Sequence, residues 1–390
     1  MEPMLRGEIR VSGPRSRVPV KQIQVSRLSR GFPELKAQRG MDMKVELTTE
    51  ERLGDRRPDD SAQEIPVAIG KSELRDLSMV NSWRGAFHIA VEWTLIVGAI
   101  FLCQRFWNPL LYIAAVMWIG SRQHALMVLM HDGVHYRLFR NRFLNEWLSE
   151  ISLAWPVLIS ARAYRRNHFA HHRHLNTERD PDWVRRRGVV AWVFPKRPRD
   201  LTLLLLNDLS GLGAIGLLRL AGSLMSKDTG VSKGFLIGRY TFYLSVTVFL
   251  IWFGAMKLAI LYWFVPLFTW LIMIFRIRSI AEHSAIEGAS QFYAQTRSTT
   301  ASLLDRIFIA PKNVNYHLEH HLYPSVPFYR LPKLHALLAS KPEFQGAHVT
   351  QTYFGVIREC VEGARTNSGE GENPTLATFA MQPDTGTMSR

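Results

Sequence analysis

The chain has 390 residues, of which 47% are hydrophobic, including 11 Trp and 21 Phe. So much apolar surface excludes a wholly disordered chain. Two cysteines exclude a disulfide framework, a cysteine-based zinc module and a cysteine-ligated iron–sulfur cluster. The formal net charge of +15 fits either nucleic acid or an anionic membrane surface. Because the basic residues flank apolar runs, we expect a membrane partner and no nucleic acid.

Residues 1–78 combine basic residues, acids, Gly and Pro without a sustained helical or alternating pattern. They contain no apolar core typical of a secretory signal. We interpret them as a flexible, basic N-terminal extension. Met41 and Met43 follow its most basic part, so a mis-assigned start codon is one explanation of the extension. A basic arm for membrane contact or targeting is the alternative.

Four apolar stretches then approach the length at which a helix rising about 1.5 Å per residue crosses about 30 Å of hydrocarbon. The spans at 86–103 and 110–130 form one hairpin, and those at 240–256 and 258–275 form a second. A buried hairpin of a soluble protein is the alternative, but the scarcity of charges favours membrane spans. We therefore predict an all-α integral membrane protein with a membrane domain at 79–345 and a C-terminal segment and polar tail at 346–390.

Arginines crowd the segment 137–239 between the two hairpins, whereas the short turns hold few charges. By the positive-inside rule this segment and both termini face the cytosol, and we expect a bacterial inner-membrane protein. Two apolar runs in the segment, 201–206 and 212–224, are interrupted or flanked by polar residues and Gly. We expect them at the interface or against the helix bundle.

Eight of the 14 histidines fall into three short clusters. The first holds His131 and His135 and follows the second span. The second holds His168, His171 and His172, and the third, after the fourth span, holds His317, His320 and His321. Helix positions i, i+3 and i+4 share a face, so each cluster can aim two or three imidazoles at one point.

The predicted topology brings all three clusters to the cytosolic face, where His283 can join them. Seven to nine neutral imidazoles exceed the needs of one ion and suit a pair of first-row metals; iron, copper, nickel and zinc all remain open on ligand softness. Surface or core roles are the alternative for any single histidine, and we prefer them for His88, His124, His335 and His348.

These residues resemble the membrane fatty acid desaturase superfamily, whose pattern is HxxxH, HxxHH and a distal HxxHH around two pairs of spans. The flanking sequences are similar too, with HFAHHRHLNTERDPDW at 168–183 and NYHLEHHLYPSVPFYRL at 315–331. The resemblance covers roughly residues 85 to 340. It implies a cytosolic helical cap that carries a non-haem di-iron centre. The metal ligands carried over are His131, His135, His168, His171, His172, His283, His317, His320 and His321.

Carboxylates near the three histidine clusters, which we also call histidine boxes, are candidates for orienting the ring N–H that faces away from a metal. The alternative is that they are ordinary carboxylates exposed to solvent. These candidates are Asp132, Asp180, Asp182 and Glu319. Asn313 and Asn315 precede the third box and are candidates for a water-mediated contact with the metals or a structural role.

The implied reaction uses O2 and two electrons to remove hydrogen from an unactivated C–H bond. We expect an O2-dependent desaturase of a fatty acyl chain. Asp132 follows His131 where acyl desaturases have glutamate, a variant also familiar from carotenoid enzymes. A hydroxylase, ketolase or oxidative decarboxylase of a lipid or terpenoid is therefore the alternative. A histidine-rich metal transporter or receptor is a remote third hypothesis.

Electrons must come from another protein, because the sequence has no cysteine-rich rubredoxin-like module, nucleotide-binding GxGxxG or haem-binding His-Pro-Gly-Gly segment. A separate ferredoxin-, rubredoxin- or cytochrome-like donor is expected. Such donors are often acidic, so Arg162, Arg165, Arg166 and the run 185–187 are candidates for docking one. Lipid headgroups explain these arginines equally well.

Overall fold

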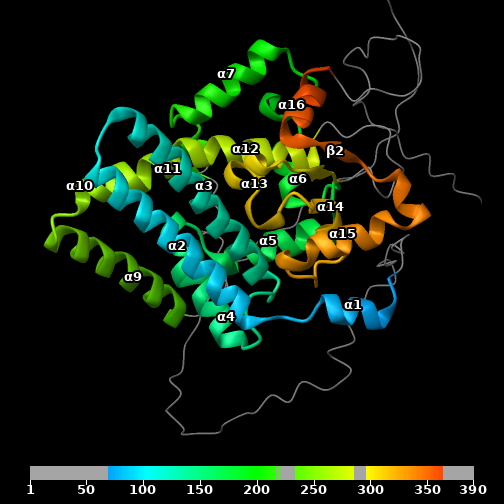
Figure 1. Cartoon of the computed structure of the whole chain (residues 1–390), viewed down its shortest axis with the longest axis horizontal. Helices are drawn as coiled ribbons and strands as arrows, with labels where there is room; N and C mark the ends of the chain where they lie inside the picture. The colour runs from blue at the N-terminus through cyan, green and yellow to red at the C-terminus, as the bar shows by residue number, and fades with distance from the viewer. Residues whose placement is uncertain (1–68, 217, 220–232, 285–295, 363–390) are drawn as a thin grey trace, which may run out of the picture. The chain divides into compact units, whose positions relative to one another are not determined.

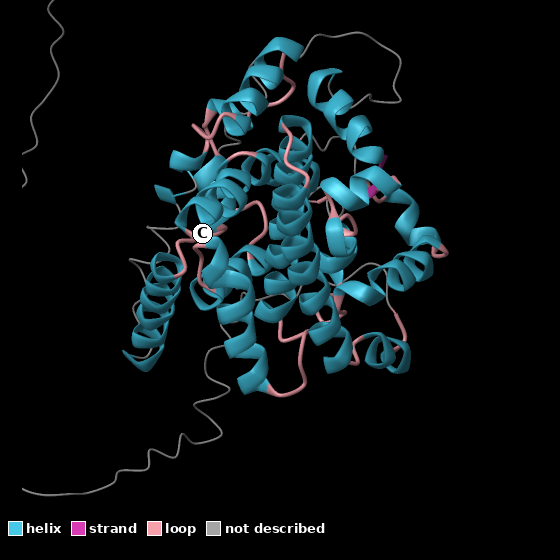
Figure 2. Ribbon diagram, turned by 60° about the vertical axis from the view of Figure 1, so that its left-hand side comes forward, coloured by secondary structure: helices cyan, strands magenta, loops and turns pink. Residues whose placement is uncertain are grey.

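The computed structural model describes residues 69–216, 218–219, 233–284 and 296–362. The helices of the described residues are α1 (Lys71–Leu77), α2 (Ser82–Arg105), α3 (Pro109–Val134), α4 (Arg142–Leu148), α5 (Ala161–Arg173), α6 (Pro181–Arg186), α7 (Pro198–Leu209), α9 (Lys233–Trp252), α10 (Met256–Ala259), α11 (Val265–Phe268), α12 (Trp270–His283), α13 (Leu303–Phe308), α14 (His317–Leu322), α15 (Leu331–Ala339) and α16 (Thr352–Glu362). The fold is mostly helical (Figures 1 and 2).

Four stretches are long and apolar enough to cross a membrane: Lys71–Arg105, Pro109–Val134, Lys233–Trp252 and Met256–His283. The first includes both α1 and α2. Their surroundings differ, because 67% of the apolar window of α3 is buried but only 11% of that of α9. Helix α3 is therefore central, and α9 presents an apolar surface that suits lipid. The two-hairpin arrangement remains a prediction.

The third and fourth spans start earlier than the sequence predicted. Helix α9 begins at Lys233 rather than at 240 and ends at Trp252, before Gly254, whose φ is +62°. The sequence places the start of the third span at the edge of its apolar run. A helix can extend beyond the hydrocarbon, because long charged side chains there reach water. The fourth stretch begins at Met256 and continues beyond the predicted end at 275, so that His283 lies on its last turn.

Pro266 interrupts the fourth stretch, as its missing N–H and its ring clash with the preceding turn require. A π-helical turn at Ile260–Phe264 precedes it, and Thr269 leaves the helical conformation after it. Side chains of the first two spans hold this irregular region. Gln104 donates to the hydroxyl of Tyr262 at 2.5 Å, and Gln123 donates to the carbonyl of Trp263 at 2.9 Å.

Within the mostly helical fold, two short strands that the sequence did not predict form a parallel ladder. β1 (Ser298–Thr300) pairs with β2 (Val349–Gln351), with Ser298 opposite Val349. The ladder supports the third histidine cluster: Asn315 donates to the carbonyl of Thr299 at 2.8 Å and accepts from its N–H at 2.9 Å. It therefore fixes the start of α14.

A buried ion-pair network joins the first two spans to the loop before the third cluster. Glu92 of α2 is 1% exposed and accepts from Lys312 at 2.6 Å and from Arg122 of α3 at 3.2 Å. Lys312 and Asn313 both have left-handed φ angles, 57° and 59°. Such non-glycine conformations persist only where the surroundings hold them. Glu92 therefore helps fix this strained loop.

Segments outside the four apolar stretches also pack against the rest of the fold. Helix α7 packs on α12 through the Arg276–Asp208 ion pair, in agreement with the bundle-side placement expected of residues 201–206. Leu77 of α1 and Val356 of α16 are buried. Both lie in segments predicted as an extension and a C-terminal segment, whose boundaries remain predictions. The expected flexible part up to residue 68, the run 220–224 and the tail from 363 lie outside the described residues.

Candidate metal centre

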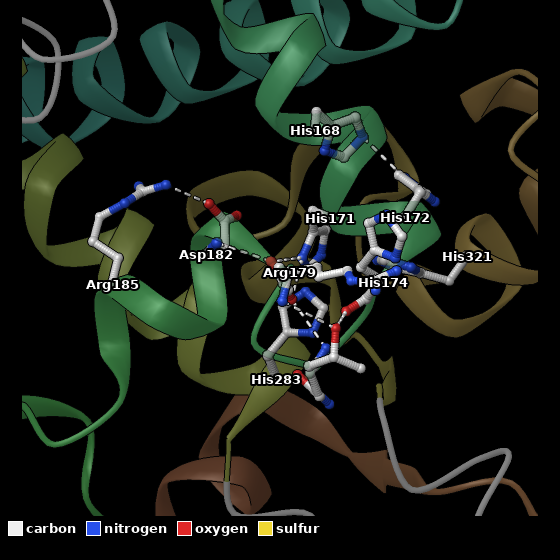
Figure 3. A network of polar contacts seen from close by, with 12 residues as sticks. His168, His171, His172, His174, Arg179, Asp182, Arg185, His283 and His321 are labelled. Carbon is white, nitrogen blue, oxygen red and sulfur yellow. Dashed lines mark hydrogen bonds and ion pairs between the residues drawn. The ribbon is translucent and has the colours of Figure 1, made fainter. Parts of the chain in front are cut away.

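Three helices and the end of a fourth present the histidines. His131 lies on the last turns of α3 and His135 caps that helix, α5 carries His168, His171 and His172, His283 ends α12, and α14 carries the third cluster. Figure 3 shows the rings of His171, His172, His283 and His321 close together although they come from distant parts of the chain. The structure thus brings all nine predicted histidines together.

The nine imidazoles separate into two groups. His131, His135, His168, His172 and His320 form one, and His171, His283, His317 and His321 form the other. Within each group the ligand nitrogens all lie within 4.8 Å of one another. In both α5 and α14, the pair spaced by four residues points to one group and the third histidine points to the other. The groups are therefore adjacent, and the rings of His172 and His321 stack at 4.2 Å.

Neighbouring Nε2 atoms have the spacing of ligands around one ion. In the five-histidine group, the Nε2 of His168 lies 2.8 Å from that of His135 and 2.9 Å from that of His172. In the four-histidine group, the Nε2 of His317 lies 2.9 Å from that of His283 and 3.1 Å from that of His321. Nitrogens about 2.1 Å from an ion and at right angles about it are about 3.0 Å apart. Each group therefore fits one ion.

Burial lowers the pKa of most of these rings and so favours the neutral imidazole that can bind a metal ion. It lowers the pKa of His168, His172, His317, His320 and His321 well below the ordinary value, with further lowering from neighbouring rings. It also lowers the pKa of His135 to about 3. These imidazoles are neutral at pH 7, which leaves a lone pair for a metal. The Nε2 of His131 is buried and has no hydrogen-bond partner among the described residues, as a ligand atom requires.

Side chains that are not members of the two histidine groups hold three of the rings in place through contacts with Nδ1. Asp180 lies 2.9 Å from the Nδ1 of His171, Glu282 lies 3.3 Å from that of His317, and the Tyr164 hydroxyl lies 3.3 Å from that of His168. Such contacts set the tautomer that leaves the lone pair of Nε2 available to a metal ion. Burial opposes ionisation of Asp180, but the bonds from His171 and from backbone N–H groups lower its pKa overall.

Of the four predicted orienting carboxylates, only Asp180 contacts a ring of the two groups. Asp132 accepts from the backbone N–H of Phe328 at 2.8 Å, Glu319 binds the Nδ1 of His335 at 2.5 Å, and Asp182 pairs with Arg185 at the surface (Figure 3). Their roles are structural. Asp132 and Glu319 connect the boxes to the segment 328–335 that follows them.

Glu282 and Tyr164 were missed by the sequence reasoning. Tyr164 lies four residues before His168 on α5, a spacing that is detectable once the helix is known. Glu282 sits beside His283 and accepts from Arg278 at 2.6 Å. Glu150 was also missed: its buried carboxylate accepts from the backbone N–H of Arg162 at 2.9 Å, at the start of α5. Burial raises the pKa of Glu150 to about 7.

The other predicted candidates lie outside both groups. Asn313 donates to the carbonyl of Phe328, and Asn315 to that of Thr299. The histidines assigned to other roles contact protein groups instead: His88 meets Lys312, His335 meets Glu319 and His348 meets Glu359, while His124 is buried against the ring of Phe275.

The fold and the site define a class of protein: helical, with four candidate membrane-spanning helices and two histidine groups that can hold metal ions. The model of the family described as "Fatty acid desaturase" matches residues 106–353. The chain belongs to this family.

Its similar proteins are oxidative enzymes. The dihydrorhizobitoxine desaturase of Bradyrhizobium elkanii is 28% identical over 75% of this chain and 84% of its own. A beta-carotene ketolase of Paracoccus sp. (strain PC1) is 24% identical over 58% and 80%. A putative sphingolipid delta(4)-desaturase/C4-monooxygenase of Caenorhabditis elegans is 26% identical over 63% and 64%. The protein is therefore an oxidoreductase of desaturase or oxygenase type.

Proposed function

We propose that the protein is a membrane di-iron desaturase that uses O2 to introduce a double bond into a fatty acyl chain. The observation that carries the proposal is the sorting of nine imidazoles into adjacent groups of five and four. Such a donor set, with no thiolate and no carboxylate among the grouped atoms, suits two first-row metal ions. All nine histidines are proposed as ligands.

Iron is favoured over zinc because the family relatives carry out oxidations and zinc has no redox chemistry. An iron pair bound here supplies the oxidising power, from O2 and two electrons, that an unactivated C–H bond requires. Residues of the chain set the protonation state and the orientation of the imidazoles. Burial lowers the pKa of six of the imidazoles and so keeps them unprotonated. Asp180, Glu282 and Tyr164 fix the orientation of three rings.

The proposed placement has two hairpins in the membrane and the histidines on the cytosolic side. Gly85, near the start of α2, packs against the backbone of Leu138, just after the end of α3. The turn at 106–108 that joins these helices lies at their opposite ends. Both histidine-bearing ends of α3 and α12 then face the arginine-rich segment, which supports a cytosolic site. A bacterial inner membrane is the proposed location.

A lipid substrate is proposed because exposed apolar helix faces give direct access from a bilayer. The names of the relatives support an alternative outcome on the same scaffold, since they include a ketolase and a desaturase/monooxygenase. The alternative is a hydroxylase, ketolase or oxidative decarboxylase of a lipid or terpenoid. The position of the substrate carbon relative to the metals decides between these outcomes.

A separate ferredoxin-, rubredoxin- or cytochrome-like protein is the proposed electron donor. A cavity of about 510 Å³ beside Tyr136 contains Arg142, Arg162, Arg165 and Arg166 and one acid, Glu146. Arg162 and Arg165 pair with Glu146, and among the predicted docking residues Arg185 and Arg187 also have acidic partners. The cavity keeps an excess of positive charge for an acidic donor.

The test is expression with a compatible reductase, followed by mass spectrometry of the host's lipids. Loss of two hydrogens from an acyl chain supports desaturation, whereas gain of one oxygen supports the alternative. His171→Ala and His320→Ala each remove a ligand from a different group and should abolish either product. A product that persists in both variants would refute the proposed metal centre.

A further inference from the structure

A second basic cavity lies at the start of α2, apart from the histidine groups. It has a volume of about 380 Å³ and is lined by Asn81, Arg84, Tyr329, Arg330 and Lys333. Three of these five residues are cationic and none is acidic. A concave surface with this charge attracts an anion.

Contacts within the protein leave the cavity's positive charge uncompensated. The Arg84 guanidinium lies over the Tyr329 ring at 4.9 Å, and Arg330 donates to the backbone carbonyl of Asp76. No ion pair of Arg84, Arg330 or Lys333 is present within the described ranges 69–216, 218–219, 233–284 and 296–362. The cavity is formed by residues 81–84 and residues 329–333, and a hydrogen bond from the N–H of Asn81 to the Tyr329 hydroxyl, at 2.8 Å, joins these two segments. Arg84 and Arg330 are therefore held at the cavity by contacts within the protein.

An exposed apolar stripe leads from this cavity along α2. Trp83 and Phe87 are 85% and 62% exposed and flank Arg84, and Val97 and Phe101 are 61% and 67% exposed farther along the helix. Their helical spacing, together with the exposed Ala90 and Thr94, puts them on one side of α2. In the proposed placement, Trp83 lies at the membrane interface and the rest faces hydrocarbon.

We propose that this cavity binds the phosphate of an anionic phospholipid, whose acyl chains lie along the exposed stripe of α2. The cations supply charge-assisted hydrogen bonds to the phosphate, and the stripe supplies apolar contact. A free phosphate ion would use the cavity alone. The combination of cavity and stripe favours a lipid, and the proposal rests on the membrane placement of the proposed function.

The test uses the full-length, metal-loaded protein in phosphatidylcholine nanodiscs with increasing phosphatidylglycerol. Native mass spectrometry measures the bound anionic lipid. One interfacial cation contributes about fivefold in affinity, so Arg84→Gln/Lys333→Gln should weaken binding about thirtyfold, and each single variant about fivefold. The control is Arg105→Gln, at the other end of α2, which should bind as the wild type does.

Phe87→Ser separates a lipid from free phosphate, because it should weaken lipid binding and leave inorganic phosphate binding unchanged. Unchanged lipid binding by the double variant, or equal loss in Arg105→Gln, would overturn the proposal. So would inorganic phosphate that binds as tightly as the lipid and displaces it. Metal content checks folding of each variant. A protein that retains the lipid but forms no oxidised product would overturn the proposed function and leave this site standing.

Discussion

Asp180→Asn should weaken metal binding by the four-histidine group. Asp180 is fully buried and holds the Nδ1 of His171 at 2.9 Å, and it also accepts from the N–H groups of Asn176 and Asp182 at 3.0 and 2.8 Å. An amide has one acceptor oxygen in place of two, so at least one of these buried donors loses its partner, at about 1 to 3 kcal/mol. Loss of a group that orients a ligand typically lowers metal affinity about 10- to 100-fold, which is consistent with that range.

The assay is a metal titration of the metal-free protein, followed by competition with a chelator. We expect one of the two bound ions to weaken by this factor while the other keeps its affinity. Asp182→Asn is the matched control, because among the described residues its carboxylate pairs only with the surface residue Arg185, and its loss should matter little. Equal affinity of Asp180→Asn and wild type at both sites would refute the reasoning.

Three further perturbations test other parts of the structure. Glu92→Gln removes the carboxylate partner of the buried Arg122 and of the partly buried Lys312 and should destabilise the protein by about 3 to 5 kcal/mol; a melting temperature equal to the wild type's would contradict this. Gly133→Ala places a methyl group 2.0 Å from the Ser149 hydroxyl and should lower the melting temperature, with partial recovery on adding Ser149→Ala; no recovery would show that the clash is not the cause. Burial lowers the pKa of six of the grouped histidines, to about 3 for His135, so the unfolded chain binds more protons than the folded one below the ordinary value of 6.5. Stability of the metal-free protein should therefore fall as pH falls through that value, and a melting temperature that rises on acidification would count against the assignment.

The residues that hold the site were only partly predictable. The three boxes are visible because their spacing is helical and local. His283 was found because the topology put it on the same side. The contact of Glu282 with His317 could not be found in this way, because it joins residues 35 positions apart on two different helices, α12 and α14.

The fold shows the same division between local pattern and long-range contact. Apolar runs located all four spans, but hydropathy marks where hydrocarbon ends rather than where a helix ends, so α9 begins seven residues before the predicted position. The β1–β2 ladder joins strands of three residues that are about 50 positions apart. Such short strands carry no alternating pattern long enough to detect.

The di-iron centre is tested by the metal content of protein purified from the membrane, together with the Mössbauer spectrum of a sample grown on ⁵⁷Fe. We expect two irons per chain, coupled as a pair, with one site disturbed in His171→Ala and the other in His320→Ala. Stable zinc in protein that is active in air, or a single iron per active chain, would contradict it.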